Sequence, residues 1–359
     1  MSPLRIAAHI SAAEWGGAER RSLALLAELA RRGHHVVVYC NTDRIAEKTR
    51  EHGLEAVLSP LRGDVRIDHA LSFARRLRTL RPDVLILVTF RRLLLGALAG
   101  RIARVPRTIA RVGLASDVAR SAKYRFVLKR WIDDVVLNAE SLHAPFVASL
   151  APGSRARVHV IPNGVERRSA PMERDQARAG AGVPPDAFVL GTVARLVRQK
   201  RHDRLIEAVA ALDDVHAVIA GDGYLRSELE QIAGAAGVAH RIHFLGHRED
   251  VGNVMSMLDV YVVASDQEGM SAGMLEAMAA RLPVVSTRVS GAEEALLKGP
   301  EAGIVTGFAA REIADAVHSL RQDSALRERL ARAAEQVARE RYGLAAMADR
   351  WETLIASHT

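Results

Sequence analysis

The sequence predicts an α/β protein of two similar domains, each built around a parallel β-sheet. The chain has 359 residues, which is long for one domain and comfortable for two. Its hydrophobic fraction of 49% is high enough to fill packed cores. Short apolar segments alternate with helical ones in both halves, which is typical of parallel sheets with right-handed crossovers. Two such domains facing each other would leave a ligand-binding cleft between them.

The first half of the chain carries the first alternating series. Leu23, Leu26 and Leu29 recur at helical spacing within residues 18–32, so a helix is expected there, and Gly33 ends it. The apolar segments of this half are expected to be strands: Leu4–Ile10, His35–Cys40, Asp83–Val88, Thr108–Val112, Asp134–Asn138 and Val158–Ile161.

The second half repeats the pattern after a change of composition. The stretch from Asn163 to Asp186 is rich in glycine, proline and arginine, so we expect an interdomain linker there. Residues 324–356 are expected to be helical, with a break near Tyr342. The predicted domains are therefore 1–165 and 166–342, followed by a final helix at 343–359. The strands of this half are expected at Phe188–Val193, His216–Ala220, Ile242–Leu245, Val260–Ala264 and Val284–Ser286.

Cysteine and histidine usage limits the chemistry that the chain can perform. Its single cysteine, Cys40, excludes an internal disulfide and a cysteine-based metal cluster, and it favours a reducing, cytoplasmic setting. No pair of histidines with a nearby acid has metal-ligand spacing, so we expect neither metal nor cofactor. The apolar stretch Val84–Gly100 contains Arg91 and Arg92, so it is not predicted to span a membrane.

The positive charge of the chain predicts anionic partners. Its net charge is +8 and its pI is about 10.1. Nucleic acid is a weak candidate because aromatic content is only 4% and no stacking motif appears. Residues 101–130 hold nine lysines or arginines and one acid, Asp117. A nucleotide diphosphate or an anionic lipid would suit this charge, although a solvated surface explains many such runs equally well.

Two glutamates in one short segment give the strongest functional signal. Glu268 lies in a loop after the strand Val260–Ala264, and Glu276 lies on the helix that follows. A helix N-terminus attracts phosphate, and carboxylates accept hydrogen bonds from sugar hydroxyls. Such a pair is usually solvated surface, but the methionines around it indicate a partly buried site. Glycoside hydrolysis also uses two carboxylates, but it needs no cationic clamp nearby.

Three strand-to-helix turns supply further candidate residues. Gly16 and Gly17 follow the first strand and would let the backbone approach a ligand closely, although glycine is common in such turns. Arg195 and Lys200 follow Phe188–Val193 and would clamp a diphosphate, unless they are ordinary solvated charges. Gly221 begins a Gly-Asp-Gly turn expected beside the ligand's base. The third glycine of a dinucleotide fingerprint is replaced by arginine, which argues against nicotinamide binding.

Taken together, these motifs resemble the retaining sugar-nucleotide glycosyltransferases of family 4, which have the two-domain GT-B fold. The resemblance spans nearly the whole chain and is strongest from residue 188 to 294. It implies Rossmann-like domains facing across a cleft and a C-terminal helix that returns to the first domain. The matching residues are Gly16-Gly17-Ala18-Glu19, Ile161-Pro162-Asn163-Gly164-Val165, Arg195 with Gln199-Lys200, Glu268 with Glu276, and Leu275–Ala279 with Pro283–Val285.

The resemblance also implies a role for each matching residue. Arg195 and Lys200 would neutralise the departing diphosphate, and Glu268 would contact the donor sugar, so these three are the expected catalytic residues. Glu276 would bind the ribose hydroxyls. The remaining donor-binding residues are expected to be Gly16, Gly17 and Gly221, together with the backbone N–H groups of Met270, Ser271 and Ala272.

The acceptor side departs from the family pattern. Many relatives have a histidine near the anomeric carbon of the donor, whereas this chain has Thr108–Gly113 there, without histidine. Within that stretch, Arg111 would either orient an anionic acceptor or simply sit at a strand end.

The expected function is a cytoplasmic, metal-independent retaining transferase that uses a UDP-sugar, with a GDP-sugar second. Its acceptor would be a glycan or a glycolipid in cell-surface polysaccharide or lipopolysaccharide biosynthesis. Basic and aromatic residues at 119–131 suggest peripheral attachment to an anionic membrane. The alternatives are a GT-B nucleotide-sugar epimerase and a non-catalytic pseudo-glycosyltransferase subunit; a nucleic-acid binder is motivated by charge alone.

Overall fold

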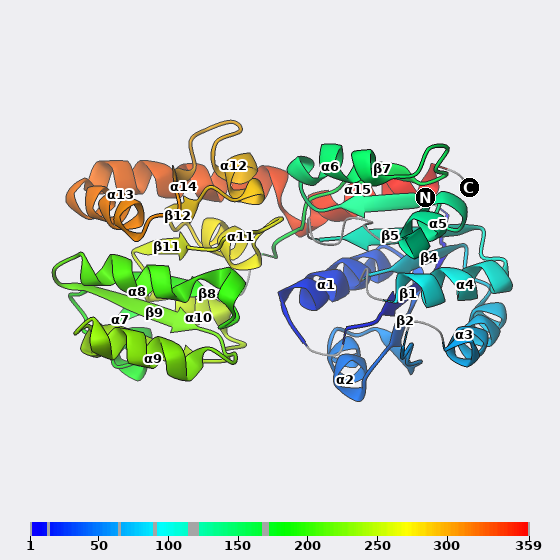
Figure 1. Cartoon of the computed structure of the whole chain (residues 1–359), viewed down its shortest axis with the longest axis horizontal. Helices are drawn as coiled ribbons and strands as arrows, with labels where there is room; N and C mark the ends of the chain where they lie inside the picture. The colour runs from blue at the N-terminus through cyan, green and yellow to red at the C-terminus, as the bar shows by residue number, and fades with distance from the viewer. Residues whose placement is uncertain are drawn as a thin grey trace. The chain divides into compact units, whose positions relative to one another are not determined.

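The chain forms two compact units, each with its own parallel sheet (Figure 1). The computed structural model describes residues 2–12, 15–63, 66–88, 92–113, 122–166 and 172–357. One unit comprises Met1–Gly164 and Leu344–Thr359, and the other comprises Val165–Gly343. The predicted α/β class is confirmed, and both sheets are parallel throughout their described strands.

The first unit has a seven-stranded sheet within its described residues, in the order β3-β2-β1-β4-β5-β6-β7. Six of its strands match the predicted ones. The seventh, β3, was not predicted because its four residues begin with a glutamate and none is fully buried. The strands are β1 (Arg5–Ile10), β2 (His35–Cys40), β3 (Glu55–Leu58), β4 (Val84–Leu87), β5 (Arg107–Val112), β6 (Asp134–Leu137) and β7 (Arg157–Val160).

Helices cover both faces of this sheet, and each face has its own hydrophobic core. The C-terminal helix α15 (Leu344–Ala356) packs on α1 (Gly17–Arg31), with Trp351 fully buried between helix and sheet. Arg107 on β5 donates to the Leu354 carbonyl at 2.5 Å. The predicted return of the final helix to the first domain is therefore confirmed. The other helices are α2 (Asp43–Glu51), α3 (Ile67–Leu80), α4 (Leu93–Ala103), α5 (Ala122–Arg130), α6 (His143–Ser149) and the short η2 (Glu140–Leu142).

The second unit has a six-stranded sheet within its described residues, in the order β10-β9-β8-β11-β12-β13. The five predicted strands are present. The edge strand β13 was not predicted because it has only four residues and begins with glycine. The strands are β8 (Phe188–Val193), β9 (Val215–Ala220), β10 (Ile242–Gly246), β11 (Val260–Val263), β12 (Val284–Thr287) and β13 (Gly303–Thr306).

The helices of the second unit flank its sheet, as Figure 1 shows. The helical region at 324–356 has the predicted break, because α14 ends at Arg341 and α15 begins at Leu344. The helices are α7 (Arg174–Gly180), α8 (His202–Ala210), α9 (Arg226–Ala235), α10 (Val251–Ser256), α11 (Ala272–Ala279), α12 (Ser290–Leu296), α13 (Ala310–Gln322) and α14 (Ser324–Arg341), with the short η3 (Arg198–Lys200) and η4 (Ala239–Arg241).

The predicted interdomain linker is wrong for its second part. Residues 167–171 lie outside the described residues, but α7 follows them and belongs to the second unit. Arg178 on α7 is 2% exposed and donates to the carbonyls of Met257, Pro185 and Ala187 and to Asp259. Composition alone indicated a loop, because an arginine anchored by four acceptors looks like surface charge in a sequence.

Candidate functional site

The strand order of each sheet points to one place where a ligand is expected. In the second unit the chain runs outward from β8 in one direction and from β11 in the other, so these neighbouring strands form the topological switch point. Ligands of open α/β sheets bind beyond the carboxyl ends of the strands at such a point. Arg195 and Lys200 follow β8 and Glu268 follows β11, so the fold brings these three predicted residues to the same edge.

The loops that follow β8 and β11 are joined by hydrogen bonds. The Gln199 side-chain amide donates to the carbonyl of Gln267 at 2.7 Å. The backbone N–H of Asp266 donates to the Gln199 carbonyl at 3.0 Å. These bonds hold the cationic loop and the carboxylate loop as one surface.

Lys200 and Glu268 form an ion pair in the structure. Both side chains are largely buried, with 17% and 9% of their surface exposed, and the Ser265 hydroxyl donates to the same carboxylate at 3.1 Å. The sequence predicted separate ligands for the two groups, diphosphate for Lys200 and sugar for Glu268. In the structure the two groups neutralise each other, as buried charges require.

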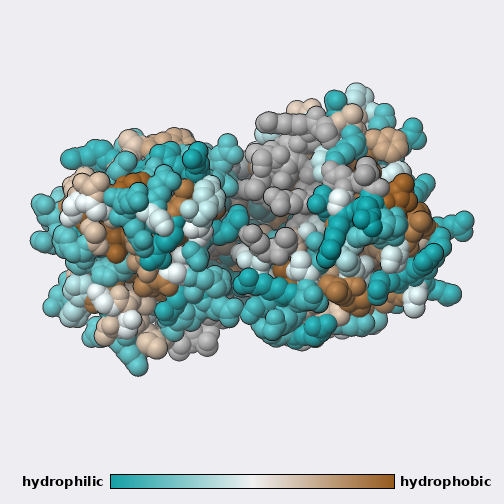
Figure 2. Space-filling view, turned by 60° about the horizontal axis from the view of Figure 1, so that its bottom comes forward, coloured by the Kyte–Doolittle hydropathy of each residue, from teal (hydrophilic) through white to brown (hydrophobic). Residues whose placement is uncertain are grey.

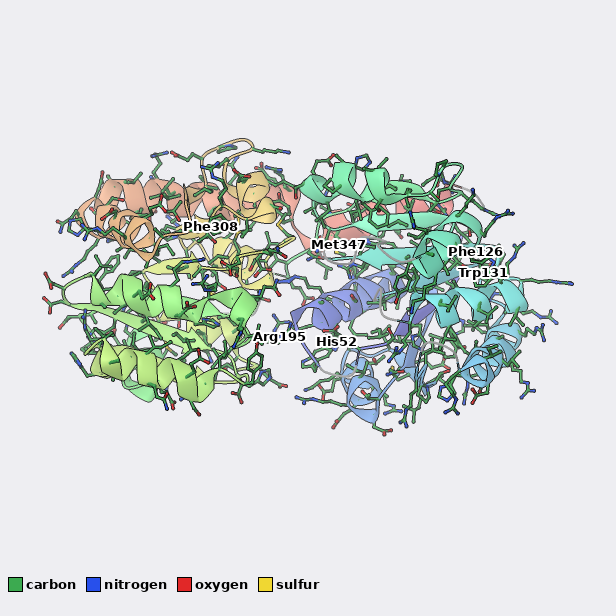
Figure 3. The ribbon with its side chains drawn as sticks, in the orientation of Figure 1. His52, Phe126, Trp131, Arg195, Phe308 and Met347 are labelled. Atoms are coloured by element: carbon green, nitrogen blue, oxygen red, sulfur yellow. The ribbon has the colours of Figure 1, made fainter. Side chains whose placement is uncertain are left out.

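Arg195 lies at the end of β8 with an exposed side chain (Figure 3). Its backbone carbonyl accepts a hydrogen bond from Nε2 of His202 at 3.1 Å. His202 is 3% exposed, and its burial lowers its pKa from 6.5 to about 4. The neutral imidazole therefore fixes the backbone from which the Arg195 guanidinium extends toward solvent.

Helix α11 carries the second carboxylate and begins at the same edge. Ser271 caps it, because its hydroxyl accepts from the backbone N–H of Met274 at 3.5 Å. Its first turn leaves backbone N–H groups without intrahelical partners, which suits an anion. Glu276 is partly buried on this helix, and the negative charges of Glu276 and Glu268 both raise the pKa of the buried Tyr261 hydroxyl.

Burial is the main cause of the raised pKa of Tyr261, with the two carboxylates adding to it. The Tyr261 hydroxyl also lies 3.2 Å from the backbone nitrogen of Val193 and 3.4 Å from its carbonyl oxygen. A Cβ on Gly273, in the first turn of α11, would lie 2.0 Å from this hydroxyl, so only glycine fits at position 273. Tyr261 is thus a spacer that sets the distance between the end of β8 and α11.

Gly221 has φ of +143° and follows β9. A Cβ there would lie 1.9 Å from the carbonyl oxygen of Ala194 in the neighbouring loop. The predicted tight turn at this position is therefore also a close contact with the loop that carries Arg195. The contact positions that loop; whether Gly221 touches a ligand's base stays a prediction.

In the first unit, Gly16 and Gly17 lie at the start of α1, which follows β1 beside the switch point between β1 and β4. Gly16 is the N-cap residue, and its carbonyl accepts from the backbone N–H of Arg20 at 3.0 Å. Gly16 has no side chain with which to cap this helix, and because α1 follows β1, its first-turn N–H groups lie at the carboxyl edge of the sheet. Residues 13 and 14 of the same loop lie outside the described residues.

Arg111 is a buried member of β5, with 8% of its surface exposed. Its guanidinium donates to the Ser22 hydroxyl and to the Asn163 side-chain oxygen, both at 2.5 Å. Burial, together with the smaller effect of the positive charge of Arg21, lowers its pKa from 12.5 to about 10. These contacts hold Arg111 at its strand end, and the role of this residue toward an anionic acceptor stays a prediction.

Sequence reasoning missed three residues that shape the site: His202, Tyr261 and Ser265. A buried histidine just after the Lys200 turn and a tyrosine inside an apolar strand both look like core in a sequence. Ser265 directly follows the predicted strand Val260–Ala264, and this position at a carboxyl strand end was the available signal.

Two buried histidines, one in each unit, predict loss of stability in acid. His9 donates from Nε2 to the Ser59 carbonyl at 3.0 Å, and burial lowers its pKa to about 4, as it does for His202. Since the unfolded pKa is 6.5, this stability is complete above pH 6.5 and is lost as pH falls toward 4. We expect unfolding free energy to fall by about 2 kcal/mol per histidine between pH 7 and pH 5.

Urea unfolding at the two pH values measures this effect. All three tryptophans (15, 131 and 351) lie in the first unit, so their fluorescence follows the unit that contains His9. A His9→Gln variant should show a smaller pH dependence in this signal, whereas His202→Gln should not change it. An equal pH dependence in wild type and His9→Gln would contradict the assignment.

Two family models together match nearly the whole chain. The model described as "Glycosyltransferase Family 4" matches residues 15–168, and the one described as "Glycosyl transferases group 1" matches residues 173–337. The chain belongs to glycosyltransferase family 4. Within the residues that the structure describes, this family 4 chain shows no group of three or more histidine, cysteine, aspartate or glutamate side chains placed to hold a metal ion.

Curated relatives of this family 4 chain resemble about half of it. The lipopolysaccharide core biosynthesis glycosyltransferase LpsE of Rhizobium meliloti (strain 1021) is 33% identical over 180 residues, which cover 50% of this chain and 53% of LpsE. The alpha-D-kanosaminyltransferase of Streptomyces kanamyceticus is 34% identical over 183 residues, covering 49% and 47%. The chain thus spans about half the length of the curated relatives it matches.

Solved structures resemble the whole family 4 chain. Anabaena Alr3699/HepE in complex with UDP and glucose superposes with a TM-score of 0.87 at 21% identity, covering 99% of this chain and 100% of HepE. WaaG, a glycosyltransferase involved in lipopolysaccharide biosynthesis, has a TM-score of 0.73 at 20% identity, covering 98% and 100%. These likenesses confirm the predicted GT-B fold.

Proposed function

We propose that this chain is a retaining glycosyltransferase that moves a sugar from a nucleotide-diphosphate donor to a glycan or glycolipid acceptor. The observation that carries the proposal is the meeting of Arg195, Lys200 and Glu268 at the switch point of the second sheet, beside the start of α11. Cations and helix N–H groups suit the diphosphate, and carboxylates suit the hydroxyls of sugar and ribose.

The chemistry assigned to this site is stabilisation of the leaving group. Cleavage of the bond between sugar and diphosphate passes through an oxocarbenium-like state, and negative charge builds up on the departing diphosphate. Arg195 and Lys200 would neutralise that charge, and the N–H groups of Met270, Ser271 and Ala272 would add hydrogen bonds. These groups need no metal ion to hold the diphosphate.

When a donor binds, Lys200 and Glu268 would exchange their contact with each other for contacts with the donor. A bound diphosphate offers Lys200 a stronger negative charge than one carboxylate does. Glu268, released from Lys200, keeps the Ser265 hydroxyl and can accept hydrogen bonds from the sugar.

UDP is the preferred nucleotide of the proposal, with GDP second. HepE, which shares the fold, was crystallised with UDP and with UDP-glucose. LpsE and LpsD of Rhizobium meliloti are named for lipopolysaccharide core biosynthesis. These likenesses support a role in cell-surface polysaccharide or lipopolysaccharide biosynthesis.

Thermal unfolding in the presence of UDP-, GDP- and ADP-sugars tests the proposal. A donor at 100 times its Kd stabilises the folded state by about 2.7 kcal/mol, which would raise Tm by roughly 5–10 °C. Glu276→Ala should remove the shift because the ribose contacts are lost. Glu293→Ala is the matched control, since Glu293 is an exposed carboxylate on the next helix and pairs with Arg288. No shift with any nucleotide sugar would refute donor binding.

Product analysis tests the transfer and its stereochemistry. Incubation of the UDP-sugar with candidate glycan and lipid-linked acceptors should release UDP and give a product whose anomeric proton coupling matches that of the donor. Inversion at the anomeric carbon would disprove retention, and epimerisation of the sugar without an acceptor would identify an epimerase instead.

We further propose that α5 attaches the chain to an anionic membrane. Arg125, Phe126 and Arg130 are exposed on this helix, with Phe126 51% exposed and packed edge-to-face on Trp131 at 5.2 Å between ring centroids (Figure 3). Basic and aromatic side chains on one helix suit an anionic bilayer surface. The preceding part of the predicted segment, including residues 119–121, lies outside the described residues.

Two further observations concern the surface and the helices of the chain. On the face shown in Figure 2, hydrophilic side chains predominate and hydrophobic ones occur in separate patches. Among the helices of the described ranges, none is both long and apolar enough to cross a bilayer.

Sedimentation with vesicles that contain anionic lipid checks the role of α5. Each arginine near such a surface contributes about 1 kcal/mol, so the double variant Arg125→Ala/Arg130→Ala should bind roughly 30-fold more weakly. Arg44→Ala/Arg50→Ala is the matched control, because both arginines are exposed on α2 of the same unit. Equal losses in the two double variants would show that net charge, and not α5, attracts the chain to lipid.

A further inference from the structure

Tyr224 is an aromatic residue that is largely exposed. Its side chain is 71% exposed, the largest exposed fraction among the large hydrophobic side chains of the described residues. It lies in the turn between β9 and α9, at the carboxyl edge of the second sheet. An aromatic ring held in water at the ligand-binding edge of a sheet loses hydrophobic stabilisation, so a role in binding explains it better than a role in the core.

The turn that carries Tyr224 is held against the turn that carries Arg195. The backbone N–H of Leu196 donates to the Asp222 carbonyl at 2.9 Å, and the N–H of Leu225 donates to the Leu196 carbonyl at 3.2 Å. A Cβ on Gly223 would lie 2.3 Å from the Leu196 oxygen, so the two backbones are in direct contact. The position of the tyrosine is therefore fixed relative to the cationic loop.

The tyrosine hydroxyl makes a further contact with that loop. It accepts from the backbone N–H of Arg198 at 3.4 Å, in the short turn that ends with Lys200. The turn of Tyr224 is held from its other side as well, because the N–H of Gly221 donates to the Gly246 carbonyl at 2.7 Å. The ring is thus anchored at its hydroxyl end while most of its surface stays open.

The order of the strands places Tyr224 on a particular side of the donor site. Glu268 and Glu276 follow β11, and Tyr224 follows β9, on the opposite side of β8. In a nucleotide sugar the diphosphate separates the sugar from the nucleoside. With the diphosphate on the cations that follow β8, a base directed toward β9 would meet the ring of Tyr224.

We propose that Tyr224 is the stacking platform for the nucleobase of the donor and therefore a residue that determines donor affinity. The inference rests on the proposed function, since it needs a nucleotide at this edge. Stacking of a base on an aromatic side chain is worth about 1–3 kcal/mol, which corresponds to a change of roughly 5- to 150-fold in Kd.

Calorimetric titration of the whole chain with UDP and with inorganic pyrophosphate separates the base from the diphosphate. Tyr224→Ala should weaken UDP binding by roughly 5- to 150-fold and leave pyrophosphate binding unchanged. Tyr224→Phe keeps the ring and should keep most of the UDP affinity. If UDP binding weakens as much in Tyr224→Phe as in Tyr224→Ala, the hydroxyl contact and not the ring face is what matters, and the proposal is wrong.

Tyr224→Trp gives a direct optical test, because all three natural tryptophans lie in the first unit. Stacking of uracil on the new indole should quench its fluorescence on addition of UDP but not of pyrophosphate. Phe308→Trp is the matched control: Phe308 is 46% exposed and follows β13, four strands from β9 in the sheet (Figure 3). That distance is about 19 Å at the usual strand spacing, so UDP should not quench this reporter.

The two proposals fail in different ways. If wild type does not bind UDP, the proposed donor is wrong. If wild type binds UDP and Glu276→Ala loses it, but Tyr224→Ala binds as wild type does, the donor site stands and the stacking role of Tyr224 is refuted.

Discussion

Lys200→Ala should lower kcat by about 10²–10³-fold, the largest effect on activity that we expect from a single side chain. The reason is that the ammonium group would neutralise charge on the departing diphosphate, and the loss of one fixed donor to a developing anion has an effect of this size. KM should change less, because the charge on the diphosphate rises in the transition state. Steady-state kinetics with the UDP-sugar and its acceptor measure both constants.

The ion pair with Glu268 provides the control for this prediction. Lys200→Ala leaves a carboxylate that is 9% exposed without its cation, so the variant should also be less stable. Adding Glu268→Gln removes the unpaired charge and should restore stability, while kcat stays low because Glu268 is itself proposed to contact the donor sugar. Arg198 lies in the same short turn and its side chain is exposed, so Arg198→Ala should have nearly wild-type kcat. If the double variant regains activity, the kinetic defect came from misfolding, and Lys200 is not catalytic.

Much of the fold could be predicted because its determinants are local. Continuous apolar segments such as Val260–Val263 and the leucine spacing of α1 identify buried strands and covering helices without tertiary information. The strands β3 and β13 were not predicted because each has only four residues, the first is glutamate or glycine, and the middle two are only partly buried. Their sequences therefore lack the apolar run on which the prediction depends.

The contacts of the site could not be predicted because they depend on strand order. Lys200 and Glu268 are 68 positions apart in the sequence. They meet because β8 and β11 are neighbours in the sheet, whereas β9 and β10 lie between them in the chain. The residue types alone suggested cations for a diphosphate and carboxylates for a sugar, and this prediction did not require the order of the strands. The ion pair between Lys200 and Glu268 depends on the strand order of the sheet.

Arg111 is a second residue whose contacts could not be predicted from the sequence. In the sequence it is one cation in a basic stretch, and an anionic acceptor is a natural partner for it. In the structure Ser22 comes from α1 and Asn163 from the last residues of the first unit before Val165, and together they occupy its guanidinium. The charge of Arg111 does not reveal these contacts in the sequence, because they come from residues 89 and 52 positions away.

Gly291→Ala should destabilise the second unit by about 1–3 kcal/mol and weaken UDP binding at the same time. Gly291 lies in the first turn of α12, and a Cβ there would lie 1.8 Å from the carbonyl oxygen of Gly269 and 2.9 Å from the Cα of Met270. Both atoms are backbone, so the loop before α11 has to move. That loop carries the N–H groups of Met270 and Ser271, which are proposed to hold the diphosphate.

Gly234→Ala is the matched control, because it makes the same substitution in a helix of the same unit. A Cβ on Gly234 in α9 would have no neighbour within 4 Å, so the variant should gain about 0.5–1 kcal/mol from the loss of glycine's flexibility. Urea unfolding should therefore show a lower free energy of unfolding for Gly291→Ala and a higher one for Gly234→Ala. UDP titration should show weaker binding for Gly291→Ala and wild-type binding for Gly234→Ala. Wild-type stability and UDP affinity in Gly291→Ala would mean that the loop between Glu268 and α11 does not need its observed position to bind a donor.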